Sequence, residues 1–307
     1  MAQQRFVSIG ECMIEMSGGE DRLYRLGYAG DTLNTAWYMR ALLGKDWSVD
    51  YFTGLGEDKY SGDIRAFLDA NDIGTSHIRT VPGRRPGLYM IHQQDGDRQF
   101  TYWRDTSAAK LLADDKDALN AAVKGASMVY FSGITLAILA PRARGRLLGA
   151  IVKARDAGAR IVFDTNIRPA LWTSPRVMTS VLTAVATLCD VVLPTHGDEA
   201  PLFGDANADE TADRYLELGV EEVVVKDGAG DAVIATAHER VKVGPKPGAK
   251  VVDATGAGDS FNGAYLSARL AGQSLQAAAE AAHAVAGIVI GQKGALVDPA
   301  LLGSARR

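Results

Sequence analysis

The most informative stretch of this 307-residue sequence reads Val251-Val252-Asp253-Ala254-Thr255-Gly256-Ala257-Gly258-Asp259-Ser260-Phe261-Asn262-Gly263. Its apolar start and its two closely spaced glycines predict a strand that turns into a helix. The N-terminus of a helix offers unpaired N–H donors and a partial positive charge, and glycine lets an anion approach without a Cβ in the way. The pattern therefore predicts an anion hole suited to a phosphate group, formed by Gly256, Ala257 and Gly258.

Asp259 falls in the first turn of this predicted helix, beside the place where a transferring phosphoryl group would lie. A carboxylate there can accept the proton of an attacking hydroxyl, which is an arrangement typical of kinases. A helix cap next to a tight turn is the alternative that the spacing leaves open. A Walker A loop is excluded because no Gly-Lys-Ser or Gly-Lys-Thr occurs, and a dinucleotide fingerprint is excluded because the next glycine is Gly263.

Short apolar runs along the rest of the chain alternate with helical patterns. This alternation predicts βαβ units around a mostly parallel sheet, and therefore an α/β fold. A helix covering Leu33–Leu43 is expected to be capped by Asp31 or Thr32, and a second is expected at Asp58–Ala70. The expected strands are Phe6–Ile9, Val49–Thr53, Met128–Phe131, Ile161–Phe163, Val191–Leu193 and Val223–Val225.

Two regions break this alternation. Residues Cys12–Tyr28 look short, Gly-rich and irregular, whereas Gly87–Ile91 and Gln99–Arg104 flank the turn Asp95-Gly96-Asp97 and predict a hairpin. A lone hairpin cannot bury two faces, so it should pack over the core or against another subunit. We therefore expect a single domain over residues 1–307, with a β lid formed by about 11–30 and 86–105, and a homo-oligomer that pairs through the lid.

Composition excludes several classes of protein. The chain has 33 basic and 37 acidic residues and a net charge of -4, with no basic run, which argues against a nucleic-acid partner. The longest weakly apolar stretch, Ser127–Ala140, is too short for a membrane span, and no signal-peptide pattern precedes the first strand, so a cytoplasmic protein is expected. Cys12 and Cys189 are far apart and predict buried free thiols.

The stretch from Asp253 to Phe261 strongly resembles the second signature of the ribokinase-like PfkB carbohydrate kinases. This resemblance implies a three-layer α/β core with a mostly parallel central sheet and a small β-sheet lid, and it implies ATP and Mg2+ as cofactors. Five further segments resemble those of the 2-keto-3-deoxygluconate kinases within that family: Gly10–Glu15, Gly30–Thr35, Pro86–Tyr89, Tyr102–Arg104 and Ser132–Ile134.

The resemblance also implies which residues form the site. Asp259 would be the catalytic base, helped by Gly256, Ala257 and Gly258. The substrate would contact Gly30, Asp31, Thr32, Leu33, Asn34, Tyr89, Tyr102, Trp103, Arg104, Arg168 and Asp259. The nucleotide would contact Asn166, Arg168, Thr195, Lys226, Gly228, Gly230, Gly256, Ala257, Gly258, Asp259 and His283.

Two of these positions depart from the family pattern. The Asn-x-x-Glu motif that many members use near magnesium reads Thr195-His196-Gly197-Asp198 here, followed by Glu199. The resemblance then implies that Asp198, through a water molecule, is the magnesium contact, in preference to Glu199. His283 either lies near adenine or is a satisfied, partly buried histidine on the predicted helix Leu275–Val289.

A sugar acid differs from a neutral sugar by a carboxylate, whose burial calls for a cation or several N–H donors. Arg104 supplies a planar fork suited to a carboxylate, and strand alternation places it on the same face as Tyr102. An exposed strand charge is the alternative interpretation of Arg104.

The expected reaction is ATP-dependent phosphorylation of the C6 hydroxyl of 2-keto-3-deoxygluconate. A fructokinase- or ribokinase-like kinase of a neutral sugar and a non-catalytic sugar-binding regulator are the alternatives. Acceptance of the C4 epimer, the number of subunits and a monovalent-cation requirement are left open.

Overall fold

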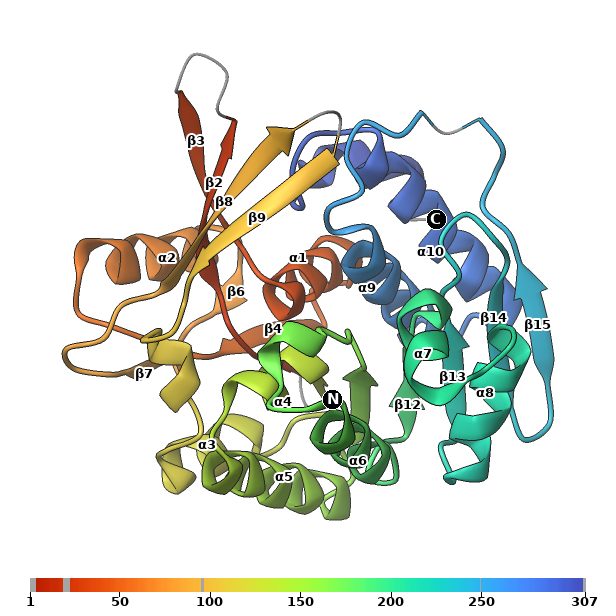
Figure 1. Ribbon diagram of the computed structural model, residues 1–307, viewed down its shortest axis with the longest axis horizontal. Helices are drawn as coiled ribbons and strands as arrows, with labels where there is room; N and C mark the ends of the chain where they lie inside the picture. The colour runs from red at the N-terminus through yellow and green to blue at the C-terminus, as the bar shows by residue number, and fades with distance from the viewer. Residues whose placement is uncertain (1–3, 19–22, 95–96, 249, 306–307) are drawn as a thin grey trace.

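The computed structural model describes residues 4–18, 23–94, 97–248 and 250–305 (Figure 1). Within these residues a nine-stranded central sheet runs in the order β15-β14-β13-β12-β11-β10-β1-β4-β6. The strands from β13 to β6 pair in parallel, whereas β14 and β15 extend the sheet in antiparallel pairs. Their bounds are β1 Gln4–Ile9, β4 Trp47–Phe52, β6 Ile73–Gly74, β10 Met128–Ser132, β11 Arg160–Asp164, β12 Val191–Val192, β13 Glu222–Val225, β14 Ala232–Thr236 and β15 Arg240–Val243. The prediction of a mostly parallel α/β sheet is confirmed.

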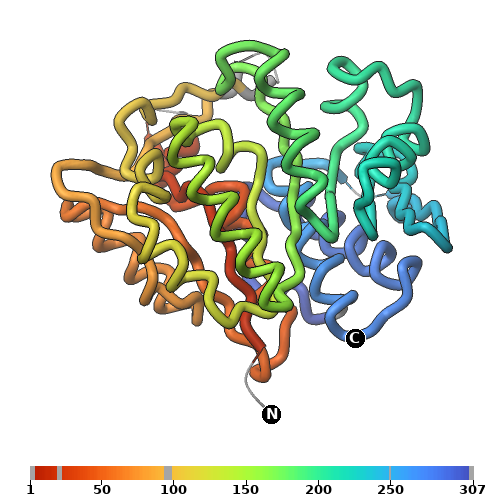
Figure 2. Tube along the Cα trace, turned by 90° about the horizontal axis from the view of Figure 1, so that it is seen from below, coloured from red at the N-terminus to blue at the C-terminus, as the bar shows by residue number. Residues whose placement is uncertain are grey.

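Helices cover both faces of this sheet and create two hydrophobic cores (Figure 2). Side chains alternate across each strand, so neighbouring residues enter different cores: Tyr130 lies in one and Phe131 in the other. One face carries α1 Asp31–Leu42, α2 Lys59–Ala70, α9 Ala257–Leu270 and α10 Leu275–Ile290. The opposite face carries α3 Lys116–Val123, α4 Gly133–Ile138, α5 Pro141–Asp156, α6 Pro175–Ala186 and α8 Ala208–Glu217.

A separate four-stranded sheet rises from the core in the order β3-β2-β8-β9 (Figure 1). It comprises β2 Met13–Gly18, β3 Tyr24–Ala29, β8 Gly87–Gln94 and β9 Asp97–Trp103. The predicted hairpin is present, with Leu88 opposite Trp103, while Asp95 and Gly96 of its turn lie outside the described residues. The expectation of irregular chain at Cys12–Tyr28 was wrong. Its strands β2 and β3 pair with each other, and β2 also pairs in parallel with β8, a partner distant in sequence that local patterns do not reveal.

The predicted cap of α1 was also wrong. Gly30 occupies the N-cap position, and no side chain caps this helix. Asp31 instead lies in the first turn, where its carboxylate accepts a hydrogen bond from Asn166. A capping side chain belongs to the N-cap residue, and Asp31 lies one position inside the helix, which explains why it does not act as the cap.

In the stretch from Val251 to Gly263, the predicted strand is absent and the predicted helix is present. No strand forms at Val251 and Val252; the N–H groups of Val252 and Asp253 both donate to the carbonyl of Ile290, at 2.7 and 3.0 Å. The end of α10 therefore takes the place of a neighbouring strand. The predicted helix follows as α9, with Asp259 in its first turn.

The remaining short elements are the pair β5 Gly54–Leu55 and β7 Arg79–Thr80, the helix α7 His196–Phe203, and the 3-10 turns η1 Ala108–Leu111, η2 Pro169–Leu171 and η3 Pro299–Ala305. Both cysteines, Cys12 and Cys189, are buried and free, as predicted. No helix in the described part of the chain is long and apolar enough to cross a membrane.

Candidate active site

A cavity of about 840 Å3 lies between the carboxyl ends of the core strands and the small sheet. Ligands of parallel α/β sheets bind outside the carboxyl ends of the strands, because the loops and helix N-termini meet there. Most of the residues predicted for the site line this cavity: Gly30, Asp31, Asn34, Tyr89, Tyr102, Arg104, Asn166, Arg168, Thr195, Asp198, Lys226, Gly228, Gly256, Ala257, Gly258, Asp259 and His283.

Four predicted contact residues are not brought to the cavity. Thr32 and Leu33 are fully buried, and the hydroxyl of Thr32 lies 3.0 Å from that of Tyr51 inside the core. Trp103 is 56% exposed because strand alternation turns it away from the face that Tyr102 and Arg104 share. Gly230 lies in the exposed turn before β14 and does not line the cavity.

Asp259 is held in the cavity wall by residues of α1. The side-chain amide of Asn34 donates to Oδ2 of Asp259 at 2.7 Å, and its own Oδ1 accepts from the N–H of Gly30 at 3.3 Å. The hydroxyl of Thr35 lies 3.4 Å from the backbone carbonyl of Asp259. One carboxylate oxygen is thereby fixed by a neutral donor that leaves the other oxygen for a proton.

The surroundings raise the pKa of Asp259 to about 7. Loss of solvent around the carboxylate contributes most, and the negative charge of Asp31 acts in the same direction. Asp164 adds a further negative charge, whereas the hydrogen bond from Asn34 and the positive charge of Lys226 oppose the increase. A carboxylate that exchanges its proton near neutral pH is suited to act as a general base.

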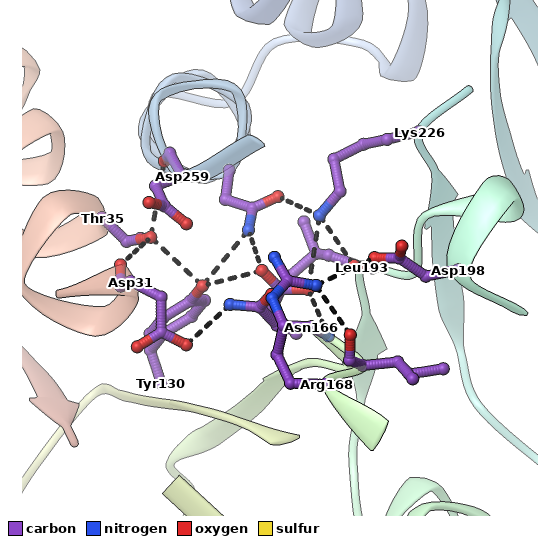
Figure 3. A network of polar contacts seen from close by, with 12 residues as sticks. Asp31, Thr35, Tyr130, Asn166, Arg168, Leu193, Asp198, Lys226 and Asp259 are labelled. Atoms are coloured by element: carbon purple, nitrogen blue, oxygen red, sulfur yellow. Dashed lines mark hydrogen bonds and ion pairs between the residues drawn. The ribbon is translucent and has the colours of Figure 1, made fainter. Parts of the chain in front are cut away.

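A buried polar network lies below Asp259 (Figure 3). The ammonium group of Lys226 donates to the carbonyl of Leu193 at 2.8 Å and to the side-chain oxygen of Asn262 at 2.9 Å, and lies 3.4 Å from Asp164. Asn262 in turn donates to Asp164 at 2.7 Å and to the hydroxyl of Tyr130 at 3.2 Å. The network connects the middle of β10 and the carboxyl ends of β11, β12 and β13 to α9, and it fixes the helix that carries Asp259.

The loop after β11 crosses to two other elements. The N–H of Asn166 donates to Asp164 at 3.1 Å, and its side-chain amide donates to Asp31 on α1 at 2.8 Å. Arg168 lies beside Asp198, with its Nη1 3.3 Å from Oδ2 of that carboxylate (Figure 3). Both charges of this pair retain access to solvent, so a bound polyphosphate could reach Arg168.

The amino end of α9 has the backbone that an anion hole requires. Gly256 adopts a left-handed φ of 76° at the N-cap, and a Cβ there would lie 2.8 Å from the carbonyl oxygen of Ala295. The N–H of Ala257 donates to Ala254, so the N–H groups of Gly258 and Asp259 are the first-turn donors that an anion could use. A Cβ at Gly258 would meet no atom within 4 Å, so the space beside it is open.

His283 shows features of both interpretations that the sequence left open. Its Nε2 lies 2.7 Å from the carbonyl of Val243, and its ring packs edge-on against Phe261 at 5.0 Å. Burial lowers its pKa, which favours the neutral ring. It also lines the cavity. The ring therefore has a hydrogen-bond partner within the protein and still faces the cavity.

Four residues of the site were missed by sequence reasoning. No role was assigned to Asp164 or to Asn262, although Asn262 stands in the stretch from Val251 to Gly263, and Tyr130 looked like an ordinary strand residue. Glu11 was overlooked although it lines the cavity, is 1% exposed and forms an ion pair with Arg104. A carboxylate two residues after a buried core strand was the signal that could have identified it.

The acidic residues around the cavity fit a magnesium ion that is carried by phosphates. No group of three or more His, Cys, Asp or Glu side chains in the described part of the chain could hold a metal by itself. Mg2+ usually keeps several waters and binds through one or two carboxylates together with substrate phosphates. Asp198 provides a partly exposed carboxylate of that kind.

Comparisons with known proteins agree with this chemistry. The family model described as pfkB family carbohydrate kinase matches residues 3–300. The chain is 38% identical over 304 residues to a 2-dehydro-3-deoxygluconokinase of Dickeya dadantii, covering 97% of this chain and 98% of that protein. It is also similar to a solved PfkB protein of Polaromonas, with a TM-score of 0.82, 26% identity and coverage of 99% and 100%. A ribokinase II of Escherichia coli, solved in complex with ATP and Mg2+, has a TM-score of 0.80, 25% identity and coverage of 95% and 94%.

Proposed function

The chain belongs to the pfkB family of carbohydrate kinases, and we propose that it transfers the γ-phosphoryl group of ATP to the C6 hydroxyl of 2-keto-3-deoxygluconate, also called 2-dehydro-3-deoxygluconate. The observation that carries this proposal is Asp259, which lies in the cavity wall at the amino end of α9 and is oriented by Asn34. The sugar acid is favoured because the relative at 38% identity, matched over nearly the whole of both chains, carries that name.

In the proposed reaction the C6 hydroxyl oxygen attacks the γ-phosphorus and its proton passes to Asp259. The bond between the γ-phosphorus and the bridging oxygen breaks, which yields the 6-phosphate and ADP. The raised pKa of Asp259, about 7, suits it to accept and later release this proton. A general base of this kind contributes on the order of 10²- to 10⁴-fold to the rate.

The remaining residues would hold the nucleotide in place and compensate the negative charge of its phosphates. The first-turn N–H groups of Gly258 and Asp259 would stabilise the transferring phosphoryl oxygens. Lys226, whose ammonium group is engaged with Leu193, Asn262 and Asp164, would act mainly by holding this part of the protein rigid. Arg168 would approach the phosphates, and Thr195, Gly228 and His283 would contact the nucleotide.

Asp198 would hold a hydrated Mg2+ ion through a water molecule, and that ion would neutralise charge on the ATP phosphates. The proposed carboxylate contact is Arg104, with Tyr89 and Tyr102 beside it on the small sheet. We further propose that this sheet acts as a lid and that its outer strands pair with a second subunit, because β3 and β9 are its edge strands and each pairs with only one strand among the described residues. A cytoplasmic location fits an enzyme that consumes ATP.

The test is ADP formation with a panel of sugars and sugar acids. The proposal expects the highest kcat/KM for 2-keto-3-deoxygluconate, and comparison with its C4 epimer defines the stereochemical preference. A higher kcat/KM for fructose or ribose would identify a kinase of a neutral sugar. Binding of a sugar without ADP formation would identify a non-catalytic sugar-binding protein.

A further inference from the structure

Glu11 lies at the junction between the core and the small sheet. It lies two residues after the end of β1 and two before the start of β2, and its side chain is 1% exposed. Its Oε2 forms an ion pair and a hydrogen bond with Nη2 of Arg104, the first residue after β9. The pair therefore connects the point where the chain first leaves the core to the point where it finally returns.

The other two crossings between core and small sheet also meet Glu11. At Gly30, between β3 and α1, an added Cβ would lie 2.1 Å from the backbone oxygen of Glu11. At Gly87, where β8 begins, an added Cβ would lie 2.9 Å from Oε1 of Glu11 and 3.2 Å from Cβ of Arg104. All four crossings thus meet at Glu11, at its backbone for Gly30 and at its carboxylate for Gly87 and Arg104, and both members of the ion pair line the cavity.

Within the part of the chain that the structure describes, the ion pair leaves one hydrogen-bonding atom of each side chain without a partner. Among the described residues, neither Oε1 of Glu11 nor Nε of Arg104 has a hydrogen-bond partner, although both atoms are buried. Glu11 thus does not occupy the whole guanidinium fork, whose planar donors can also engage a second carboxylate. The Arg104 guanidinium additionally lies 5.7 Å from the centre of the Tyr102 ring.

We propose that Glu11 is the positioning residue for Arg104 and thereby sets the affinity for the sugar acid. Arginine side chains carry about 2 kcal/mol of rotamer entropy, so a guanidinium that is already fixed binds a carboxylate at a lower entropic cost. Glu11 also compensates the charge of an arginine that is only 11% exposed before any sugar acid binds. This inference rests on the proposed function, because it requires a substrate with a carboxylate.

The experiment is a double-mutant cycle on the full-length enzyme, made of Glu11→Ala, Arg104→Ala and the double variant. For Glu11→Ala the KM for 2-keto-3-deoxygluconate should rise about ten-fold, the usual effect of losing a group that orients a binding side chain. The KM for ATP should stay the same and kcat should change far less than the KM for the acid. Adding Glu11→Ala to Arg104→Ala should change that KM by less than about two-fold, because no guanidinium is left to orient.

Two further variants separate positioning from stability. Glu11→Gln keeps an acceptor for Arg104 without the charge, so it should restore most of the affinity and remains informative if Glu11→Ala does not fold. Glu222→Gln is the matched control: this buried carboxylate pairs with Arg269 at 3.0 Å, but at the amino end of β13, far from the cavity side of the sheet. It should lower Tm and leave both KM values unchanged.

The results distinguish the inference from the proposed function. Wild-type enzyme that phosphorylates fructose but not 2-keto-3-deoxygluconate contradicts the proposed function, and the inference with it. Wild-type activity on the keto acid combined with additive effects of Glu11→Ala and Arg104→Ala contradicts the inference alone. Tighter binding of the keto acid by Glu11→Ala does so too, because Glu11 would then compete with the substrate instead of orienting Arg104.

Discussion

The side-chain amide of Asn34 donates a 2.7 Å hydrogen bond to Oδ2 of Asp259, across 225 positions of sequence. This bond joins the amino ends of α1 and α9 at the wall of the cavity. It also stabilises the charged form of a carboxylate whose surroundings otherwise favour the protonated form. The helices α1 and α9 are thus connected at the residue that we propose takes the proton.

Replacing the proposed base tests this arrangement directly. Asp259→Asn keeps the shape of the side chain but cannot accept the hydroxyl proton, so kcat should fall by at least about 100-fold while the fold and ATP binding are preserved. The measurements are turnover with 2-keto-3-deoxygluconate and calorimetric titration with ATP. Near-wild-type turnover would remove Asp259 from the role of base.

The raised pKa of Asp259 predicts the pH dependence of activity. The base works only when it is deprotonated, so kcat/KM should increase with pH through about 7 and then level off. The profile from pH 5.5 to 9, measured at low sugar concentration, reports on the free enzyme. A profile that is flat from pH 6 to 8 would contradict this pKa.

The raised pKa of Asp259 also predicts that the stability of the fold decreases with pH, whereas activity increases with pH. The pKa of Asp259 rises from 3.8 to about 7 on folding, so between these values the folded state binds more protons than the unfolded state. Stability contributed by this group is present below pH 3.8 and is lost as the pH rises toward 7. Asp259→Asn should therefore have a higher Tm than the wild type at pH 8, by an amount that shrinks toward pH 5. An equal difference at both pH values would contradict the linkage.

The two glycines before Asp259 should respond differently to substitution. Gly256 needs its positive φ and its closeness to Ala295, so Gly256→Val should lower Tm strongly. Gly258 has an ordinary helical backbone and open space beside it, so Gly258→Val should fold yet lose turnover by more than about ten-fold, because the side chain would occupy the place of a phosphate. Thermal melting and turnover of both variants provide the comparison. Gly258→Val with activity near that of the wild type would mean that this loop does not hold the transferring phosphoryl group.

The core was predictable from sequence because its strands are buried on both faces. A parallel sheet covered by helices requires continuous apolar runs, such as Met128–Phe131, and these are visible without any knowledge of their partners. Among the loop residues at the strand ends, Asn166 followed from the resemblance to known motifs, whereas Asp164 did not. The small sheet was harder, since β2 is stabilised by pairing with β8, more than seventy positions away.

The roles of side chains in the site were harder to predict from the sequence than the fold. Sequence adjacency placed Trp103 with Tyr102 and Arg104, but alternation along β9 sends its ring to the opposite face. Lys226 lines the cavity, where the sequence predicts a nucleotide contact, but the partners of its ammonium group, Leu193, Asn262 and Asp164, were not predicted. Such long-range partners depend on how strand ends meet in space, which no local pattern specifies.

The proposed choice of substrate depends on Arg104, which pairs with Glu11 and would also bind the carboxylate of the sugar acid. Removing it by Arg104→Ala leaves that carboxylate without its cation, at a cost of roughly 2 to 5 kcal/mol. Because each 1.36 kcal/mol is a factor of ten, kcat/KM for 2-keto-3-deoxygluconate should fall by about 30-fold or more. Slow activity on fructose, which has no carboxylate, should change much less.

Arg104→Lys separates the charge of this residue from its geometry. An ammonium group still compensates Glu11, which the alanine variant would leave buried and unpaired, but it lacks the planar fork that fits a carboxylate. The lysine variant should therefore regain the Tm that the alanine variant loses, and only part of its kcat/KM for the keto acid. The decisive quantity is the ratio of kcat/KM for the keto acid to that for fructose in each variant. If Arg104→Ala lowers both values equally, Arg104 serves closure of the small sheet or the phosphates, and the carboxylate of the substrate must be bound by other donors.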